Sequence, residues 1–213
     1  MNIQQIKYEL QHLISGKSGA SYDALIQAVA GHLRSSERTS PMAARKHQNK
    51  GREKDKLIEF ASANGLFIQD LPEDQFIASG AEQRVFVNGD KFVIKLNDSI
   101  YYASWEDYFY NLLLHNYFFT DMAYRLLGFH LTADTLYAAV QQPYIKADSM
   151  TDLNQVKGFM EANGFDNKRR YDYENASLGL IIEDLHDENV LTSNDVLYFI
   201  DTVFFIKPER FWT

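Results

Sequence analysis

The sequence predicts an α+β fold, and three observations point to this class. Apolar residues recur at helical spacing in residues 3–14 and 21–33. From Phe76 onward the spacing changes to the two-residue period of strands, with an Asn88-Gly89 pair that is typical of a tight hairpin. Longer helical patterns and short strands then alternate to the end of the chain. This order indicates a mixed fold, neither all-helical nor all-β.

The composition narrows the class of protein. The chain has 213 residues, a formal net charge of −8 and no cysteine. The lack of cysteine excludes a disulfide framework, a thiolate zinc site and a cysteine nucleophile. The sequence has neither an apolar run of about 18 residues nor a leading signal-peptide pattern, so we expect a cytoplasmic protein that has no membrane partner.

Residues 1–70 are expected to form a helical N-terminal extension. Ser21 is a candidate N-cap, Pro41 fits the first turn of a helix, and Asn64-Gly65 ends a helix over residues 56–67. Between residues 33 and 56 the chain carries eight basic and three acidic residues, whereas the rest is strongly acidic. This basic stretch is either a solvated helix face or a surface that binds nucleic acid.

Residues 71–145 carry the strand pattern. Three strands are expected over residues 76–79, 84–87 and 91–96, and a further strand over 136–143. Apolar positions at helical spacing predict one long helix over residues 104–127 between them.

Residues 146–213 contain shorter segments. We expect a helix over residues 151–163 that is capped by Thr151, followed by strands over 171–173 and 178–182. An Asn194-Asp195 turn separates two last short strands, residues 190–191 and 197–200.

Five residues in this order carry the parts of a phosphoryl-transfer site. Gly80 lies in a strand–turn–strand, Lys95 in the following strand, Asp184 and Asn189 in one loop, and Asp201 after a buried strand. Phosphoryl transfer needs a cation for the phosphates, a carboxylate for the acceptor hydroxyl and oxygen ligands for Mg²⁺. Lys95 can supply the first and Asp184 the second, and Asn189 with Asp201 can supply the third. The spacing of Asp184 and Asn189 equals that of the kinase catalytic loop.

Several segments together resemble one family. The loop from Asp184 and the Phe199-Ile-Asp201 segment look like those of the protein-kinase-like superfamily, especially its aminoglycoside phosphotransferase branch. The closer similarity is to the serine/threonine/tyrosine kinase domain of polyvalent proteins, which phages and conjugative elements carry. It extends over roughly residues 57–205. The segments that carry it are Gly80–Phe86, Leu112–Asn116, Tyr124–Phe129, Gln141–Ile145, Phe159–Phe165 and Asp184–Leu191.

The resemblance implies a reduced two-lobe kinase-like fold that uses ATP and Mg²⁺. Residues 71–145 would form the N-lobe and residues 146–213 a truncated C-lobe, because only twelve residues follow Asp201. In the implied site, Asp184 is the catalytic base and Asn189 and Asp201 hold the metal. The nucleotide would be bound by Gly80, by Lys95 with an acidic partner (Glu106 or Asp107), and by the hinge residues Gln142 and Tyr144.

Other interpretations stay open at this stage. Asp107 also fits a capping box with Ser104 at the start of a helix. The chain as a whole is alternatively a catalytically silent module that binds a nucleotide or a partner, or a mobile-element accessory protein that binds DNA through its basic N-terminal region. The phosphate acceptor is a protein, a small molecule or the chain itself.

Overall fold

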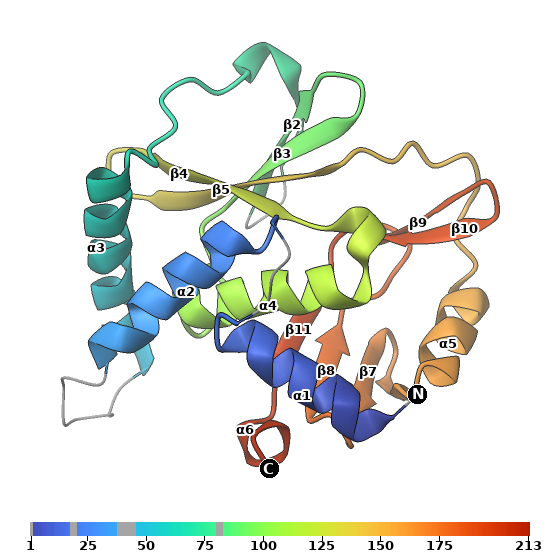
Figure 1. Cartoon of the computed structure of the whole chain (residues 1–213). Helices are drawn as coiled ribbons and strands as arrows, with labels where there is room; N and C mark the ends of the chain where they lie inside the picture. Colours follow the sequence, from blue (N-terminus) through green and yellow to red (C-terminus); the bar gives the residue numbers. More distant parts are fainter. Residues whose placement is uncertain (1, 18–20, 38–45, 80–82) are drawn as a thin grey trace.

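The computed structural model describes residues 2–17, 21–37, 46–79 and 83–213, and it confirms the α+β class (Figure 1). The helices are α1 (Ile3–Ile14), α2 (Ala24–Glu37), α3 (Lys46–Asn64), α4 (Trp105–Phe118), α5 (Leu153–Ala162) and α6 (Pro208–Phe211), with 3-10 turns η1 (Glu73–Gln75) and η2 (Thr120–Met122). The strands are β1 (Phe76–Ser79), β2 (Gln83–Asn88), β3 (Phe92–Asn97), β4 (Arg125–Leu131), β5 (Leu136–Pro143), β6 (Asp166–Arg169), β7 (Asp172–Asn175), β8 (Leu180–Glu183), β9 (Val190–Ser193), β10 (Val196–Phe199) and β11 (Val203–Ile206).

The first five strands form one antiparallel sheet in the order β1-β2-β3-β5-β4. The predicted hairpin joins β2 to β3, and Gly89 takes the positive φ of 66° that the turn requires. In the middle of the sheet, Lys95 pairs with Val85 on one side and Val140 on the other. This register fixes the backbone of Lys95 on both sides.

The long helix predicted over residues 104–127 is wrong beyond Phe118. The chain passes through the turn η2, and β4 begins at Arg125 and pairs with β5. Gly128 shows why this segment is extended, since its φ is 153° and a Cβ there would lie 2.2 Å from the carbonyl oxygen of Leu66. Pairing with β5 therefore outweighs the helical spacing of the apolar residues.

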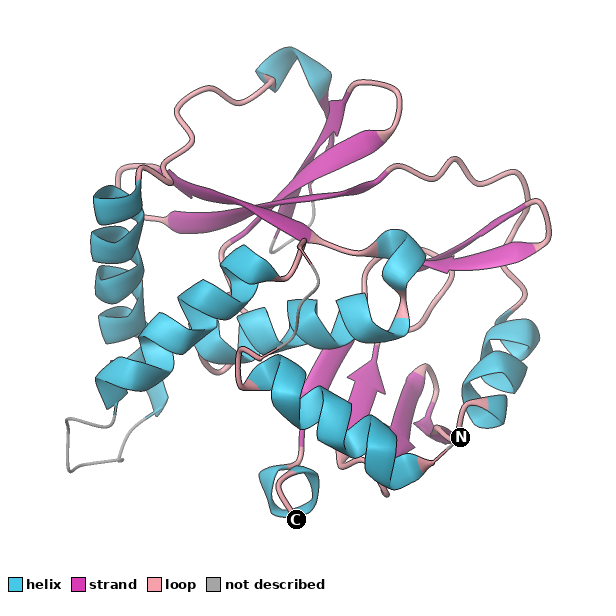
Figure 2. Ribbon diagram, viewed as in Figure 1, coloured by secondary structure: helices cyan, strands magenta, loops and turns pink. Residues whose placement is uncertain are grey.

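Helix α4 lies between the five-stranded sheet and a four-stranded sheet of order β11-β8-β7-β6 (Figure 2). Helices α1 and α2 pack along α4, and their apolar side chains belong to one hydrophobic core with those of α4 and β8. Burial of this shared apolar surface makes the largest favourable contribution to the free energy of folding. The divisions at residues 70 and 145 stay predictions.

Helix α3 begins at Lys46, about ten residues before the predicted helix, and Pro41 lies outside the described residues. Two of its lysines are bonded within the fold. Lys50 Nζ donates to the carbonyl of Tyr102 at 3.0 Å, and Lys54 Nζ donates to that of Asp134 at 2.6 Å. Burial lowers the pKa of Lys50. Part of the basic stretch therefore anchors α3 to the loops around α4.

The segment after β5 is mostly as predicted. The β9–β10 hairpin is confirmed, and its turn residues Asn194 and Asp195 both have positive φ values, 50° and 60°. The N-cap of α5 is Asp152 and not the predicted Thr151. The Asp152 side chain accepts from the N–H of Asn154, whereas Thr151 donates its hydroxyl to the carbonyl of Val190 at 2.6 Å.

The predicted cap of the second helix also differs from the structure. Helix α2 begins at Ala24, three residues beyond the expected Ser21 cap.

Strands β6 and β11 and helix α6 were not predicted from the sequence. Within the described ranges, every helix is too short or too polar to cross a membrane.

Candidate active site

A cleft of about 340 Å³ opens between the five-stranded sheet and the segments that follow it. Val85 and Val93 line it from the sheet, and Leu191 and Ile200 line it from the hairpin β9–β10 and the residues after it. Lys95 and Asp201 lie in the same cleft. An apolar cleft that also holds a few charged groups suits a ligand that has both apolar and charged parts.

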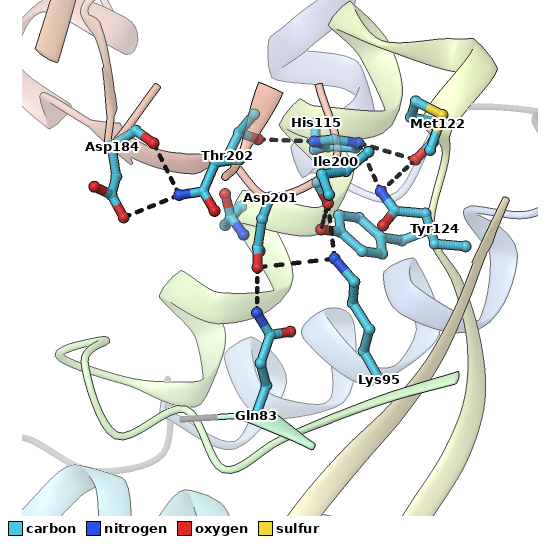
Figure 3. Close-up of polar contacts among 12 residues, drawn as sticks. Gln83, Lys95, His115, Met122, Tyr124, Asp184, Ile200, Asp201 and Thr202 are labelled. Atoms are coloured by element: carbon cyan, nitrogen blue, oxygen red, sulfur yellow. Dashed lines mark hydrogen bonds and ion pairs between the residues drawn. The ribbon is translucent and has the colours of Figure 1, made fainter. Parts of the chain in front are cut away.

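Lys95 is buried, with 6% of the residue exposed, and its charge is balanced (Figure 3). Its Nζ donates to the carbonyl of Ile200 at 2.8 Å and lies 3.8 Å from Oδ2 of Asp201. Strand β3 brings the cation to this point, because alternate residues of the strand, Val93 and Lys95, face the cleft.

Asp201 follows β10 and is the anion beside Lys95. Its side chain is 29% exposed, and Oδ2 accepts a further hydrogen bond from the side-chain amide of Gln83 at the start of β2 (Figure 3). The backbone N–H of Asp201 donates to the carbonyl of Asn189 at 3.3 Å. The carboxylate therefore points at the sheet.

Asp184 follows β8 and has a positive φ of 67°. Its side-chain oxygen Oδ2 accepts from the Asn189 amide at 3.0 Å, and Oδ1 lies 3.3 Å from Nε2 of His186. The Asn189 amide also donates to the Asp184 backbone carbonyl at 2.9 Å. These contacts orient the Asp184 carboxylate, and its side chain is 56% exposed to solvent. This is what a base for an incoming hydroxyl needs.

The predicted metal ligands lie on adjacent segments. The carbonyl of Asn189 accepts from the N–H of Ile200 at 2.9 Å as well as from that of Asp201, which ties the loop to the end of β10. Among the described residues there is no group of three or more His, Cys, Asp or Glu side chains that could by itself hold a metal ion. The donor set still fits Mg²⁺, which is usually held by one or two protein oxygens together with substrate phosphates and water.

The two hinge candidates both line the cleft. The side chain of Gln142 is buried and donates to the carbonyl of Met122 at 2.9 Å. The backbone N–H of Tyr144 donates to the carbonyl of Lys91 at 2.8 Å. Gly80, the predicted phosphate-loop residue, lies outside the described residues.

The acid that was expected to pair with Lys95 is on α4. Glu106 accepts a hydrogen bond from the hydroxyl of Tyr110, and the N–H of Asp107 donates to the Ser104 hydroxyl at 3.0 Å, which confirms Ser104 as the N-cap of the predicted capping box. The ion pair shown for Lys95 is with Asp201. Pairing of Glu106 or Asp107 with Lys95 stays a prediction.

Sequence reasoning missed Gln83, Tyr124 and Thr202 as members of the site. Tyr124 donates its hydroxyl to the carbonyl of Ile200 at 2.7 Å. Thr202 is bonded to Nδ1 of the buried His115 at 2.7 Å. Burial lowers the pKa of His115 to about 3, so the imidazole is neutral. Tyr124 and His115 both lie in segments that carry the family resemblance. That resemblance was the sequence signal that could have identified them as members of the site.

The comparison with family models gives one match, described as a serine/threonine/tyrosine kinase found in polyvalent proteins, over residues 50–208. No curated protein and no solved structure matches the chain. The matched range includes Lys95 and Asp201, which line one cleft, and Asp184 and Asn189, whose loop is bonded to the backbone of Asp201. Since the match extends over most of the chain, the protein belongs to the family of serine/threonine/tyrosine kinases found in polyvalent proteins.

Proposed function

We propose that the protein is an ATP- and Mg²⁺-dependent phosphotransferase that acts on a hydroxyl acceptor. The observation that carries this is the convergence of three segments that lie far apart in the sequence. Lys95 on β3 contacts Asp201 after β10, and Asp201 is bonded through the backbone of Asn189 to the loop that holds Asp184. These are the cation, metal ligands and carboxylate that phosphoryl transfer requires.

The adenine ring would occupy the apolar end of the cleft, between Val93 and Leu191. Lys95 would neutralise phosphate oxygens, and Asn189 and Asp201 would hold Mg²⁺, which supplies charge neutralisation to the transferring group. In the transfer itself the acceptor oxygen bonds to the γ-phosphorus, the bond from that phosphorus to the bridging oxygen breaks, and ADP leaves. Asp184 takes the hydroxyl proton. Positioning and fixed charges supply most of the rate enhancement.

We assign residues 71–145 to an N-lobe and residues 146–213 to a reduced C-lobe, with the cleft between them. The observation behind this division is that the cleft is lined by β1–β3 on one side and by residues 188–201 on the other. Residues 1–70 would be an extension that supports α4, because α1 and α2 pack along that helix. The cytoplasm, where ATP and Mg²⁺ are abundant, is the proposed location.

Binding of DNA through the basic stretch is less well supported. Lys50 and Lys54 donate to backbone carbonyls of the fold, and Arg34 donates to the Tyr110 hydroxyl at 3.0 Å. Charges that are used in this way are not presented to phosphates along a duplex.

Labelled phosphate transfer tests the proposal. The chain is incubated with γ-labelled ATP and Mg²⁺, alone and with cell lysate, and compared with Asp184→Ala. We expect this variant to lose about 10²- to 10⁴-fold in transfer rate, the usual contribution of a general base, while it still binds nucleotide.

Asp187→Ala is the matched control, because Asp187 lies in the same loop and its side chain is also 56% exposed. It should stay within about twofold of wild type. Nucleotide binding without any transfer by the wild type would instead identify a silent module. Equal losses in the two variants would contradict the role of Asp184.

A further inference from the structure

We propose that Tyr124 and His115 are positioning residues that set the metal-binding carboxylate of Asp201. This inference rests on the proposed function. Neither side chain touches Asp201 itself through a hydrogen bond that the structure shows. Each instead holds one of the two residues that flank Asp201 in the chain, Ile200 or Thr202.

Tyr124 holds the residue before Asp201. It lies just before β4 and is 3% exposed, and its hydroxyl donates to the carbonyl of Ile200 at 2.7 Å (Figure 3). The same carbonyl accepts from Nζ of Lys95 at 2.8 Å, and this Nζ lies 5.5 Å from the centre of the Tyr124 ring. Tyr124 therefore fixes the acceptor to which the phosphate-binding lysine is tied.

His115 holds the residue after Asp201. It comes from α4 and is 0% exposed, and Nε2 lies 2.9 Å from the carbonyl of Met122. A carbonyl can only accept, so Nε2 carries the proton and Nδ1 is an acceptor. The hydroxyl of Thr202, 2.7 Å away, must then donate to Nδ1. This fixed direction makes the contact a specific anchor for Thr202.

The two anchors act on one short segment. The rings of His115 and Tyr124 pack against each other with centroids 4.5 Å apart, so each limits the movement of the other. The carbonyl of Asn189 in addition accepts hydrogen bonds from the N–H groups of Ile200 and Asp201. The residues before and after Asp201 in the chain are therefore both held, and the half-buried carboxylate of Asp201 faces the cleft.

A carboxylate that is already ordered in the free protein binds a cation without the entropic cost of ordering it on binding. Loss of the Tyr124 hydroxyl would leave the Ile200 carbonyl with a donor from Lys95 but without its anchor to the core. The position of Asp201 relative to Lys95 would then vary. We expect the part of nucleotide binding that depends on Mg²⁺ to weaken, and the part that does not depend on metal to persist.

The test is nucleotide affinity measured twice, with Mg²⁺ and with a chelator, for wild type and Tyr124→Phe. The readout is the ratio of the two dissociation constants. We expect this metal effect to fall about tenfold in Tyr124→Phe, as for other groups that orient metal ligands, with the affinity in chelator unchanged. Tyr173→Phe is the control, because Tyr173 is also 3% exposed but lies in β7, outside the residues that line the cleft.

Thr202 tests the other anchor. Thr202→Val keeps the shape but removes the hydroxyl that donates to His115, and it should lower the same ratio, whereas Thr202→Ser should keep it. An unchanged ratio in both Tyr124→Phe and Thr202→Val, or equal losses with and without metal, would overturn the inference. If wild type itself shows no effect of Mg²⁺ on nucleotide binding, the proposed function fails instead.

Discussion

The two acidic groups of the site are held in different ways. Asp201 has its neighbours Ile200 and Thr202 bonded to buried side chains, and its own side chain is 29% exposed. Asp184 is 56% exposed, and its side-chain partners, Asn189 and His186, come from its own loop. The backbone around one acid is held by the core of the protein, whereas the side chain of the other is held by its own loop.

Under the proposed function, this difference separates two tasks. The phosphate and metal side must hold concentrated charge, which needs groups that are ordered before the ligand arrives. The acceptor side must admit a hydroxyl from another molecule, so its carboxylate stays open to solvent. Changes on the Asp201 side should therefore affect nucleotide binding, and changes on the Asp184 side should affect turnover.

The largest expected effect comes from removing Asp201. Asp201→Ala takes away a proposed metal ligand and removes the Lys95–Asp201 ion pair. We expect the affinity for Mg²⁺-nucleotide to fall about a hundredfold, since a bond to a charged group is worth up to about 3 kcal/mol. Asp184→Ala should change that affinity by less than about threefold. Titration calorimetry of both variants checks this, and equal losses would remove the distinction between the two sides.

An intermediate effect is expected on stability, from His115. Burial holds its pKa at about 3 in the folded state, whereas an unfolded histidine titrates near 6.5. Between these values the unfolded chain binds a proton that the folded one does not. The stabilisation is therefore complete above about pH 6.5 and is lost on acidification, at about 1.4 kcal/mol per pH unit.

The free energy of unfolding, measured by urea denaturation at pH 7 and pH 5, gives the contribution of His115 to the pH dependence of stability. Wild type should lose about 2 kcal/mol more than His115→Gln over the interval, because glutamine does not titrate. Tyr173→Phe, a change at another buried residue, should follow the wild-type difference. If His115→Gln loses as much stability as wild type, the buried imidazole is not the group that responds.

Local signals explain which elements could be predicted. Two hairpins follow from turn residues that tolerate positive φ, Asn88-Gly89 and Asn194-Asp195, and both are confirmed. The strand over residues 136–143 is also confirmed. The sequence signals were an apolar run and the proline, Pro143, at its end. The helix over 104–127 failed beyond Phe118, since spacing alone does not show that Gly128 must approach the backbone of Leu66.

The site divides in the same way. The pair Asp184 and Asn189 could be predicted from the sequence because both residues lie in one loop, five positions apart. Their side chains are hydrogen-bonded in the structure. The bond between His115 and Thr202 joins residues 87 positions apart, and no local pattern encodes it. Contacts of this kind depend on how α4 packs against the segment after β10, which the sequence expresses only through the complete fold.

The smallest expected effect is at Gln83, which reaches the Asp201 carboxylate from the sheet. Its amide N–H group donates to Oδ2, where a divalent cation would also bind. The hydrogen bond occupies one lone pair of Oδ2 and holds the carboxylate toward the sheet, so we expect it to weaken metal binding in the nucleotide-free protein. Gln83→Leu should tighten metal binding without nucleotide by about three- to tenfold, the worth of one hydrogen bond.

Binding of Mn²⁺ to the nucleotide-free protein, followed by electron paramagnetic resonance, measures this effect. The exposed Gln75, which lies in η1 outside the residues that line the cleft, provides the control Gln75→Leu. Weaker metal binding in Gln83→Leu would mean that the side-chain oxygen of Gln83 is itself a ligand. In that case the sheet supplies part of the metal site, and the contrast between a core-set acid and a loop-set acid would have to include a third group from β2.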